Sequence, residues 1–223
     1  MKRIPEVEAI NEEADVRRFN ELMGGNRFRQ AEYRELAKRI VEMGIPPQGK
    51  VLDMGTGPGF VAIEIARLLG QSGVQVVGMD LSGEMLEMAA ENAAREGLNG
   101  ILTWREGDNK AMPFTDGEFD SIVSNDSLHH WEDPLPVFNE IARVLKPGGC
   151  FLVKDSKRLQ HWWPWLFVKA LSLSIPPDFR VHWWNSIRAS YTEEELRAIL
   201  QQSRLQSWRI EEGFMDLRVV KEA

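Results

Sequence analysis

The chain has 223 residues, of which 43% are hydrophobic, with eight tryptophans and ten phenylalanines; this is enough for one α/β domain with a large core. The net charge of −7 argues against a general nucleic-acid binder, which needs a basic surface. The single cysteine, Cys150, excludes an internal disulfide and a cysteine metal cage, and we expect no metal site. No signal peptide or membrane-spanning run is recognisable, so we expect a cytoplasmic protein.

Residues 6–44 precede the first predicted strand and are expected to act as a helical flap. The segment 6–23 is acidic and weakly amphipathic, and a Gly-Gly-Asn break separates it from the next segment. Apolar residues at helical spacing then predict a helix over residues 27–43. Gly44 and the Pro-Pro pair after it end this helix. A helix in this position would lie across the edge of the sheet.

Short apolar runs alternate with amphipathic segments through the middle of the chain. The runs predict strands over residues 50–54, 74–79, 101–105, 119–124 and 150–153. The segments between them predict helices over residues 59–69, 82–95 and 134–145, the last two with Ser82 and Asp133 as N-caps. This alternation is typical of a doubly wound, parallel sheet with right-handed crossovers.

The pattern changes after the fifth predicted strand. Residues 155–190 form a tryptophan-rich insertion that includes an apolar helix ending at residue 173. A T-x-x-E capping box at Thr192 then opens another helix. Strands over 206–211 and 217–221 would close the sheet as an antiparallel hairpin. The sequence therefore predicts one domain, residues 1–223, with a seven-stranded, mostly parallel sheet.

The motif V-L-D-M-G-T-G-P-G, residues 51–59, reads as a buried strand that runs into a glycine loop and a helix. Gly55 and Gly57 suit a turn that needs positive φ or a close approach of a ligand to the backbone. In an open α/β sheet, ligands bind beyond the carboxyl ends of the strands. The polar residues expected there are Asp53, Asp80, Asp108, Asn125 and Asp155.

Asp80 lies 21 residues after Gly59, at the end of the second strand. A carboxylate in this place can accept two hydrogen bonds from ribose hydroxyls. The alternative is a strand-end carboxylate that caps the next helix. The loop is one residue shorter than the dinucleotide fingerprint G-x-G-x-x-G, and Asp53 would repel a pyrophosphate. Asp53 would suit an ammonium group, and a ribose together with an amino group points to S-adenosylmethionine (SAM).

The sequence resembles the class I SAM-dependent methyltransferases, in particular the small-molecule branch that includes the ubiquinone/menaquinone C-methyltransferases. The resemblance covers residues 48–153, about half of the chain. Besides the glycine motif, it rests on V-G-M-D-L-S (77–82), G-D (107–108) with M-P-F (112–114), F-D-S-I-V-S-N (119–125), L-H-H-W (128–131) and R-V-L-K-P-G-G (143–149). It implies the Rossmann-like methyltransferase fold.

The resemblance also implies a set of cofactor contacts. The strand end and glycine turn would approach the methionine part of SAM, through Asp53, Gly55, Thr56, Gly57 and Gly59. Asp80 would bind the ribose, Leu81 and Met85 would flank the adenine, Asp108 would meet its amino group, Asn109 would lie beside the ring, and Asn125 would line the methionine end. For Asp108, a plain Gly-Asp turn is the alternative. Phe28, Arg29 or Tyr33 of the flap would cover SAM, unless they serve ordinary helix packing and solvent exposure.

Methyl transfer is an in-line displacement at an activated methyl, so alignment and water exclusion matter most. A general base is needed only where the acceptor loses a proton. The candidates are His129, His130, His161, His182, Asp126 and Asp155. We favour His129 and His130 as catalytic residues because they follow the fourth strand. Packing of a histidine against a helix start is the alternative.

The insertion should determine the acceptor. Residues 154–190 hold six basic and two acidic residues, a net charge of +4 that leaves −11 for the rest of the chain. A basic, tryptophan-rich lid suggests a small-molecule or lipid-like acceptor, with arginines placed to meet a carboxylate or phosphate. Contact with a membrane surface is a second interpretation. Core packing or a dimer interface is a third.

Three functional classes remain to be compared. The first is a SAM-dependent methyltransferase that acts on a small acceptor. The second is a SAM-binding module without transfer activity, and the third, a nucleotide-dependent oxidoreductase, is disfavoured by Asp53 and the glycine spacing. The sequence N-D-S-L after the fourth strand lacks the Pro-Pro-aromatic motif of DNA amino-methyltransferases. A single cysteine also disfavours arsenite methylation, which uses several thiols.

Overall fold

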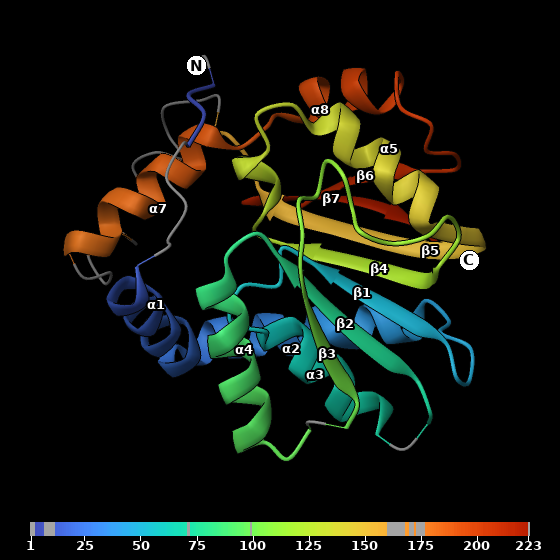
Figure 1. Cartoon of the computed structure of the whole chain (residues 1–223). Helices are drawn as coiled ribbons and strands as arrows, with labels where there is room; N and C mark the ends of the chain where they lie inside the picture. The colour runs from blue at the N-terminus through green and yellow to red at the C-terminus, as the bar shows by residue number, and fades with distance from the viewer. Residues whose placement is uncertain are drawn as a thin grey trace.

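A computed structural model describes residues 3–6, 12–70, 72–98, 100–159, 168–169, 172 and 177–222. One seven-stranded sheet has the order β3-β2-β1-β4-β5-β7-β6 (Figure 1). The strands are β1 (Lys50–Met54), β2 (Gln75–Asp80), β3 (Leu102–Glu106), β4 (Phe119–Asn125), β5 (Leu145–Ser156), β6 (Arg209–Glu212) and β7 (Asp216–Lys221). β1 to β5 pair in parallel, whereas β7 pairs antiparallel with both β5 and β6. The predicted mixed sheet with its closing hairpin is confirmed.

Helices cover both faces of the sheet and one of its ends (Figure 1). The covering helices are α2 (Arg27–Glu42), α3 (Phe60–Leu69) and α4 (Gly83–Arg95) on one face, and α5 (Pro134–Val144) and α8 (Glu193–Leu200) on the other. Two more, α1 (Glu13–Gly25) and α7 (Pro177–Ala189), lie beyond the carboxyl ends of the parallel strands. None of the described helices combines the length and apolarity that crossing a membrane requires.

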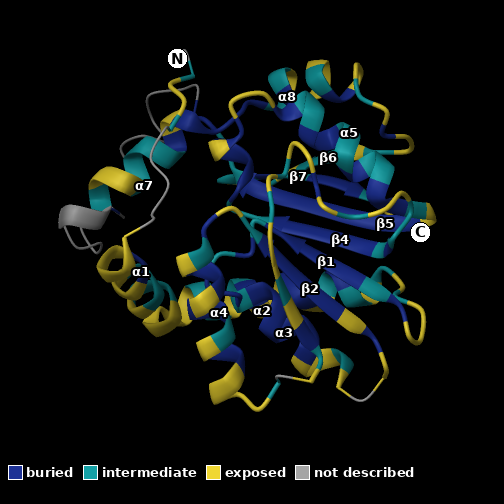
Figure 2. Cartoon of the chain, viewed as in Figure 1, coloured by how far each residue is buried: buried dark blue, intermediate teal, exposed yellow. Residues whose placement is uncertain are grey.

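Successive residues of a strand pack on opposite faces of the sheet, into two separate hydrophobic cores. In β1, Val51 packs with α2 and α3, whereas its neighbour Leu52 packs with α5 and α8. β4 repeats the pattern with Val123 and Ile122. A strand that is covered on both faces needs apolar residues at every position, which is why these strands appear as continuous apolar runs. Figure 2 shows the resulting buried sheet between helices whose outer faces are exposed.

The N-cap residues predicted from the sequence cap their helices in the structure. Ser82 accepts a hydrogen bond from the Met85 amide, and Asp133 accepts one from the Leu135 amide ahead of α5. Thr192 forms the predicted reciprocal capping box at the start of α8. Each cap satisfies a backbone amide that lacks a partner within the helix.

Three elements differ from the sequence-based expectation. β5 begins at Leu145 rather than at residue 150, because Leu145 pairs with Phe119 across a register shift. The acidic segment at the N-terminus contains a helix, α1, and the C-terminal part of the insertion forms α7. The apolar helix expected to end at residue 173 falls largely outside the described residues.

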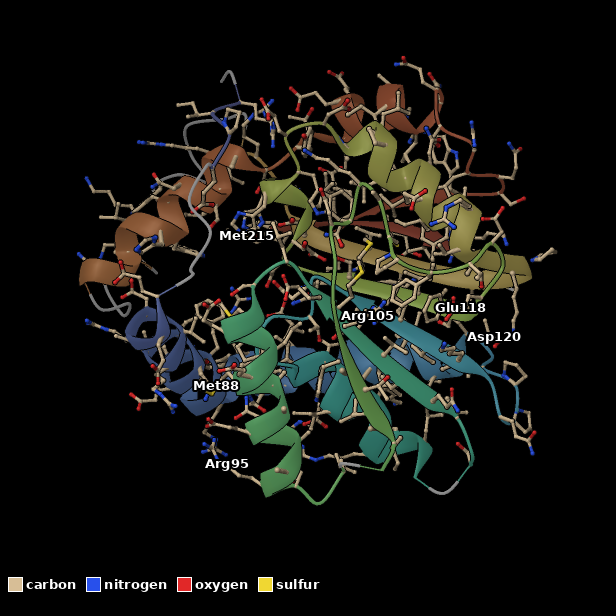
Figure 3. All side chains as sticks on the ribbon, viewed as in Figure 1. Met88, Arg95, Arg105, Glu118, Asp120 and Met215 are labelled. Atoms are coloured by element: carbon tan, nitrogen blue, oxygen red, sulfur yellow. The ribbon has the colours of Figure 1, made fainter. Side chains whose placement is uncertain are left out.

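Polar residues at the two ends of the sheet have different surroundings (Figure 3). At the amino end of β4, Glu118 pairs with the Lys50 ammonium, and Asp120 accepts a hydrogen bond from the Lys50 amide at 2.8 Å. These two carboxylates are used to hold neighbouring strands together. Met215 lies at the opposite end, next to α7. The polar residues at that carboxyl end surround a cavity.

Candidate active site

A cavity of about 1840 Å³ lies beyond the carboxyl ends of β1, β2 and β4, with α1, α2 and α7 contributing to its walls. Binding pockets for one small molecule usually measure roughly 300–1000 Å³, so this cavity can hold a cofactor and a second molecule. The predicted site residues that line it are Asp53, Gly55, Thr56, Gly57, Asp80, Leu81, Met85, Asp108, Asn109, Asn125, Phe28, Tyr33, His129 and His130.

The glycine loop has the left-handed conformation that its sequence favours. Gly55 has φ of 68° and Gly57 has φ of 52°, values that L-residues with a side chain rarely adopt. A Cβ at Gly55 would lie 2.4 Å from the Ser127 hydroxyl oxygen, whereas a Cβ at Gly57 would meet open space. The Gly55 and Thr56 amides donate to the Met79 carbonyl at 2.8 and 2.9 Å. The loop is thereby fixed to β2, with Gly57 facing the cavity.

Gly59 serves packing at the start of α3. It precedes this helix with φ of 80°, and a Cβ there would lie 2.8 Å from the Trp104 ring and 3.0 Å from the Ala89 Cβ. Gly59 is not one of the residues that line the cavity. The third glycine of the motif therefore allows close approach of α3, α4 and β3, and its predicted contact with a cofactor lacks support from its position.

Asp53 is buried and organises the loop. Its Oδ2 accepts hydrogen bonds from the Thr56 hydroxyl at 2.6 Å and from the Ala62 amide at 3.1 Å. Burial raises the pKa of Asp53 to about 7, against a smaller opposing effect of these bonds. The carboxylate fastens the glycine loop to the first turn of α3, and it also lines the cavity. A cationic ligand group there would favour its ionised form.

Asp80 joins the ends of two elements. Its Oδ2 accepts a hydrogen bond from the Gly57 amide at 2.8 Å, and its Oδ1 accepts one from the Ser82 amide at 3.1 Å. Burial raises the pKa of Asp80, while these backbone donors act in the opposite direction. The N-cap of α4 is Ser82, so Asp80 is not needed as the helix cap. Its carboxylate lines the cavity beside Gly57, as a ribose contact requires.

The pocket beyond β2 has an apolar wall and a polar edge. Leu81 is 66% exposed although it is a large apolar residue, and Met85 lies near it at 8% exposure. Asp108 accepts a hydrogen bond from the Lys110 amide at 2.8 Å, which is an ordinary turn contact. The side-chain oxygen of Asn109 is buried and has no hydrogen-bond partner among the described residues. An unsatisfied buried acceptor is costly, and a ligand with an N–H or O–H group would satisfy it.

The two aromatic residues of the flap differ in their surroundings. Phe28 is 90% exposed at the cavity, so its ring is available to a ligand. Tyr33 is buried and stacks on Phe60 with ring centroids 5.2 Å apart. Tyr33 is thus part of the core under α2 as well as a cavity residue, which combines the two predicted alternatives. Asn26 caps the helix that carries both rings.

A charged cluster connects the flap to the ends of β4 and β5. Arg29 donates to Asp126 Oδ2 at 2.8 Å and to Glu32 at 2.9 Å, and Lys154 pairs with Glu32. Asn125 donates to Asp126 Oδ2 at 3.2 Å. Burial alone would raise the pKa of Asp126, but the positive charges of Arg29 and Lys154 lower it. Asp126 is consequently an ionised partner of these cations, which disfavours its predicted use as a general base.

Asp126 also has an unusual backbone conformation, with φ of +52°. Such a conformation costs of order 1–3 kcal/mol in a residue with a side chain, and it is tolerated where the surroundings fix it. Here the ion pair with Arg29 fixes it. The turn directs the chain from β4 into the short 3-10 helix η1 (Leu128–His130), which brings both histidines to the cavity.

His129 is held in place by Asp155. Its Nδ1 lies 2.8 Å from Asp155 Oδ1, and its backbone amide donates to Oδ2 at 2.7 Å. The Nε2 atom faces the Glu6 carboxylate at 3.7 Å. Burial opposes protonation of the His129 ring, but Asp155 outweighs it and raises the pKa. Asp155 therefore acts on the orientation of His129 rather than as a separate base.

His130 follows on the same turn, with its ring centroid 4.1 Å from that of His129. The surrounding protein, followed by the adjacent His129, lowers the pKa of His130 below its ordinary value, so the ring is neutral at pH 7. His182 of α7 lines the same cavity, whereas His161 lies outside the described residues. Both histidines favoured from the sequence therefore line the cavity that the glycine loop also lines.

Tryptophans of the insertion form a small core of their own. Trp183 and Trp184 pack against Leu159, Val168 and Ile187, together with Met215. Trp183 and Met215 also line the large cavity. Trp162, Trp163 and Trp165 lie outside the described residues. For the described part, Trp183 packs in this small core and also lines the large cavity, and the lid interpretation stays a prediction.

Three basic residues in the stretch 154–190 pair with acidic residues of other elements. Lys154 binds Glu32, Lys157 lies 2.9 Å from Glu212, and Arg158 lies 2.5 Å from Glu195. Lys169, Arg180 and Arg188 line a second cavity of about 510 Å³ with Trp184. Three of the basic residues expected in the lid therefore lie around one cavity.

Sequence reasoning missed three residues at the site. Ser127 lies against Gly55 and accepts a hydrogen bond from Trp131 Nε1 at 3.1 Å. Arg3 donates to the His129 and Trp131 carbonyls at 3.0 Å, and Glu6 faces His129. Arg3 and Glu6 belong to no motif, so only the fold reveals their proximity to η1.

Comparison with known proteins agrees with this geometry. Residues 52–153 match a family model described as a methyltransferase domain. This range runs from β1 to β5 and contains the glycine loop, Asp80, Asp108 and both histidines. The match thus covers the strands whose carboxyl ends form the cofactor side of the cavity.

Two curated relatives illustrate the sequence similarity. A sterol 24-C-methyltransferase of Yarrowia lipolytica is 36% identical over 137 residues, which are 61% of this chain and 35% of that protein. A ubiquinone/menaquinone biosynthesis C-methyltransferase (UbiE) of Geotalea daltonii is 33% identical over 130 residues, 56% of this chain and 55% of that protein. The matched region spans about half or less of the length of these relatives.

A solved structure from Methanococcus maripaludis, provisionally assigned as a SAM-dependent methyltransferase, has a TM-score of 0.75 and 25% identity. The match covers 98% of this chain and 96% of that one. Together with the domain match, these findings place the chain among the class I SAM-dependent methyltransferases. The open space at Gly57 and the unsatisfied Asn109 oxygen fit SAM, the cofactor of this class.

Proposed function

We propose that this protein transfers a methyl group from SAM to a small, amphipathic or lipid-like acceptor. One observation carries the proposal: the cavity of about 1840 Å³ is larger than one small ligand needs. Its lining includes the glycine loop and Asp80 as well as His130, Trp183 and Met215. Both reactants of a two-substrate transfer would fit there side by side.

SAM, when bound, supplies a sulfonium methyl that is already activated for in-line displacement. The chain then has to align the acceptor with that methyl and exclude water. We assign alignment on the cofactor side to Gly55, Thr56 and Gly57, with Asp80 at the ribose. We assign coverage to the helical flap, residues 6–44, where the exposed Phe28 ring reaches the cavity. The lid, residues 155–190, would enclose the acceptor within the single domain.

We propose that His129 and His130 contact the reacting group of the acceptor. Both follow β4, both line the cavity, and Asp155 fixes the ring of His129 at 2.8 Å. Where the acceptor must lose a proton, this pair is in place to receive it. Asp126 is engaged by Arg29, so it does not compete for that role.

We propose that the acceptor is mainly apolar. The second cavity supports an acceptor that also carries an anionic group. Trp183 and Met215 offer apolar area in the large cavity. Lys169, Arg180 and Arg188 surround the second one, and such groups recognise carboxylates or phosphates. Two relatives are named for sterol and quinone methylation, which supports a lipid-like acceptor.

Incubation of the protein with methyl-labelled SAM and fractionated lipid and metabolite extracts tests the proposal. We expect label in a small, organic-soluble product and equimolar S-adenosylhomocysteine. Tight SAM binding without transfer to any fraction would favour the alternative, a SAM-binding module with a regulatory or assembly role. The Asp80→Ala variant is the control: transfer that depends on the proposed site should be strongly reduced in it.

A further inference from the structure

Three side chains with metal-binding atoms meet at the acceptor side of the cavity. Glu6, His129 and His130 place one ligand atom each within 4.8 Å of one another. His129 Nε2 and Glu6 Oε2 are 3.7 Å apart, and these two side chains are only 7% and 8% exposed. All three residues line the large cavity. They come from two segments that are more than 120 positions apart in the sequence.

The separations suit a transition-metal ion. Bonds from zinc to imidazole nitrogen or carboxylate oxygen measure about 2.0–2.2 Å, so neighbouring ligand atoms around a tetrahedral ion lie roughly 3.4 Å apart. The Glu6–His129 pair is already close to that value. A small rotation of the His130 ring, which lies at the exposed side of the group, would bring the third atom into range.

Asp155 supplies the outer contact that such a site needs. Metal-binding histidines usually donate their other ring N–H to a carboxylate, which fixes the tautomer and the ring direction. Asp155 holds His129 Nδ1 at 2.8 Å and its backbone amide at 2.7 Å. Donation from Nδ1 to Asp155 leaves Nε2, which lies beside Glu6, as the nitrogen that can bind a metal ion once its proton is displaced.

The N-terminal segment is anchored in a way that holds Glu6 at the histidines. The Arg3 guanidinium donates to the His129 and Trp131 carbonyls at 3.0 Å and lies 4.1 Å from the centre of the Tyr191 ring. The Ile4 amide donates to the Arg188 carbonyl at 3.2 Å. Ser186 of α7 donates to Glu6 Oε2 at 3.0 Å. These contacts fix residues 3–6 between η1 and α7.

We propose that Glu6, His129 and His130 form a binding site for a divalent transition-metal ion, with Asp155 as the positioning residue. Two imidazoles and one carboxylate suit Zn²⁺, Co²⁺ or Fe²⁺ better than Mg²⁺, which prefers all-oxygen sites. Three protein ligands leave a coordination position open, as in catalytic zinc sites. An acceptor oxygen bound at that position would have its pKa lowered by the ion. In that case His129 and His130 hold the ion and do not receive the proton themselves.

The catalytic role given to the metal ion rests on the proposed function. Metal binding itself can be measured whether or not the protein transfers methyl groups. Metal-stripped protein is titrated with Co²⁺ and followed by its visible absorption. We expect one equivalent to bind with a micromolar or lower Kd, Zn²⁺ to displace it, and millimolar Mg²⁺ to leave it bound. Glu6→Gln and His130→Ala should each weaken Co²⁺ binding at least tenfold. Asp155→Asn should weaken it about 10- to 100-fold.

His182→Gln is the matched control, because it removes another cavity imidazole outside the cluster and should leave the Co²⁺ Kd within twofold. SAM binding, measured on the same samples, reports that each variant is folded. Wild-type protein that binds SAM but shows no saturable Co²⁺ binding below 1 mM would overturn the inference. Wild-type Co²⁺ affinity in both Glu6→Gln and His130→Ala would also overturn it.

The two proposals fail in different ways. Methyl transfer that continues unchanged in excess chelator, together with absent Co²⁺ binding, would remove the metal site and leave the methyltransferase function in place. Co²⁺ binding without transfer to any acceptor would support the metal site and contradict the enzymatic function.

Discussion

The His129 ring and the Asp155 carboxylate are joined by a contact of 2.8 Å between Nδ1 and Oδ1, and the backbone amide of His129 binds the second oxygen at 2.7 Å. The carboxylate comes from the end of β5, whereas the imidazole comes from η1 after β4. One buried side chain thus fixes both the backbone and the ring of the histidine. This relationship makes η1 a rigid part of the cavity wall.

Replacement of Asp155 by Asn should reduce turnover more than binding. The asparagine side chain would have the same volume, but its amide does not stabilise the His129 orientation as a carboxylate does. A positioned proton-transfer residue contributes roughly 10²–10⁴-fold to the rate. We expect kcat for methyl transfer to fall about 100-fold while the Kd for SAM stays within twofold. Steady-state kinetics and calorimetry measure the two quantities. An unchanged kcat would show that the Asp155–His129 contact is structural only.

Asp80→Ala should weaken SAM binding at least tenfold. The variant loses the ribose acceptor and also the two bonds to the Gly57 and Ser82 amides, and hydrogen bonds to charged groups are worth about 1.5–3 kcal/mol each. Glu87→Ala, which removes an exposed carboxylate from the same helix region, is the control and should bind SAM normally. Equal SAM affinity in both variants would mean that Asp80 only supports the loop.

The stability of the ligand-free protein should depend on pH through Asp53. Its pKa is about 7 in the folded protein, against an ordinary value of 3.8, so the folded state binds the proton more tightly. The stability from this group is complete below about pH 3.8 and is lost as the pH rises through 7, by at most ~1.4 kcal/mol per pH unit. Asp53→Asn should lack this decrease between pH 5 and 7.5 in urea unfolding. Parallel pH dependences of the two proteins would contradict the assignment.

The two flap aromatics should respond differently to truncation. Phe28→Ala removes an exposed ring and should leave the unfolding free energy within about 0.5 kcal/mol of wild type, while it weakens ligand binding. Tyr33→Ala removes a buried ring stacked on Phe60 and should cost about 3–5 kcal/mol. Denaturant unfolding and SAM titration of both variants measure these effects. A large loss of stability in Phe28→Ala would place that ring in the core.

Trp183→Ala should leave SAM binding intact and raise KM for the acceptor. Trp183 belongs to α7, lines the cavity and packs in one cluster with Met215. It is far from the glycine loop in the sequence. Trp208→Ala, another partly buried tryptophan but one packed against the α5–α8 core, is the control for a general loss of stability. If Trp183→Ala unfolds at ambient temperature, the packing interpretation of the lid tryptophans is correct.

Much of the fold arises from local patterns in the sequence. β1, β2 and β4 are apolar on both faces, and their ends carry the polar residues that the cavity gathers, such as Asp53 and Asp80. The glycines at 55 and 57 and the caps at Ser82 and Thr192 have short-range causes, so their effects are local as well. Strand order is set by right-handed crossovers.

Other features depend on contacts between distant segments and have no local pattern. Glu6 reaches His129 because Arg3 donates to the His129 and Trp131 carbonyls, which are 126 and 128 positions away in the sequence. The role of Gly59 depends on Trp104 from another strand. Lys157 and Arg158 look like lid cations in the sequence, but acids of later elements pair with them. Such relationships become visible only when the chain is folded.

Calorimetric titration of the protein with SAM, with NADH in a parallel experiment, tests the central claim most directly. The geometry of Gly57, Asp80 and Asn109 predicts one SAM per chain, displacement by S-adenosylhomocysteine, and at least tenfold weaker binding in Asp80→Ala. Clear binding of NADH with no heat from SAM would contradict the account.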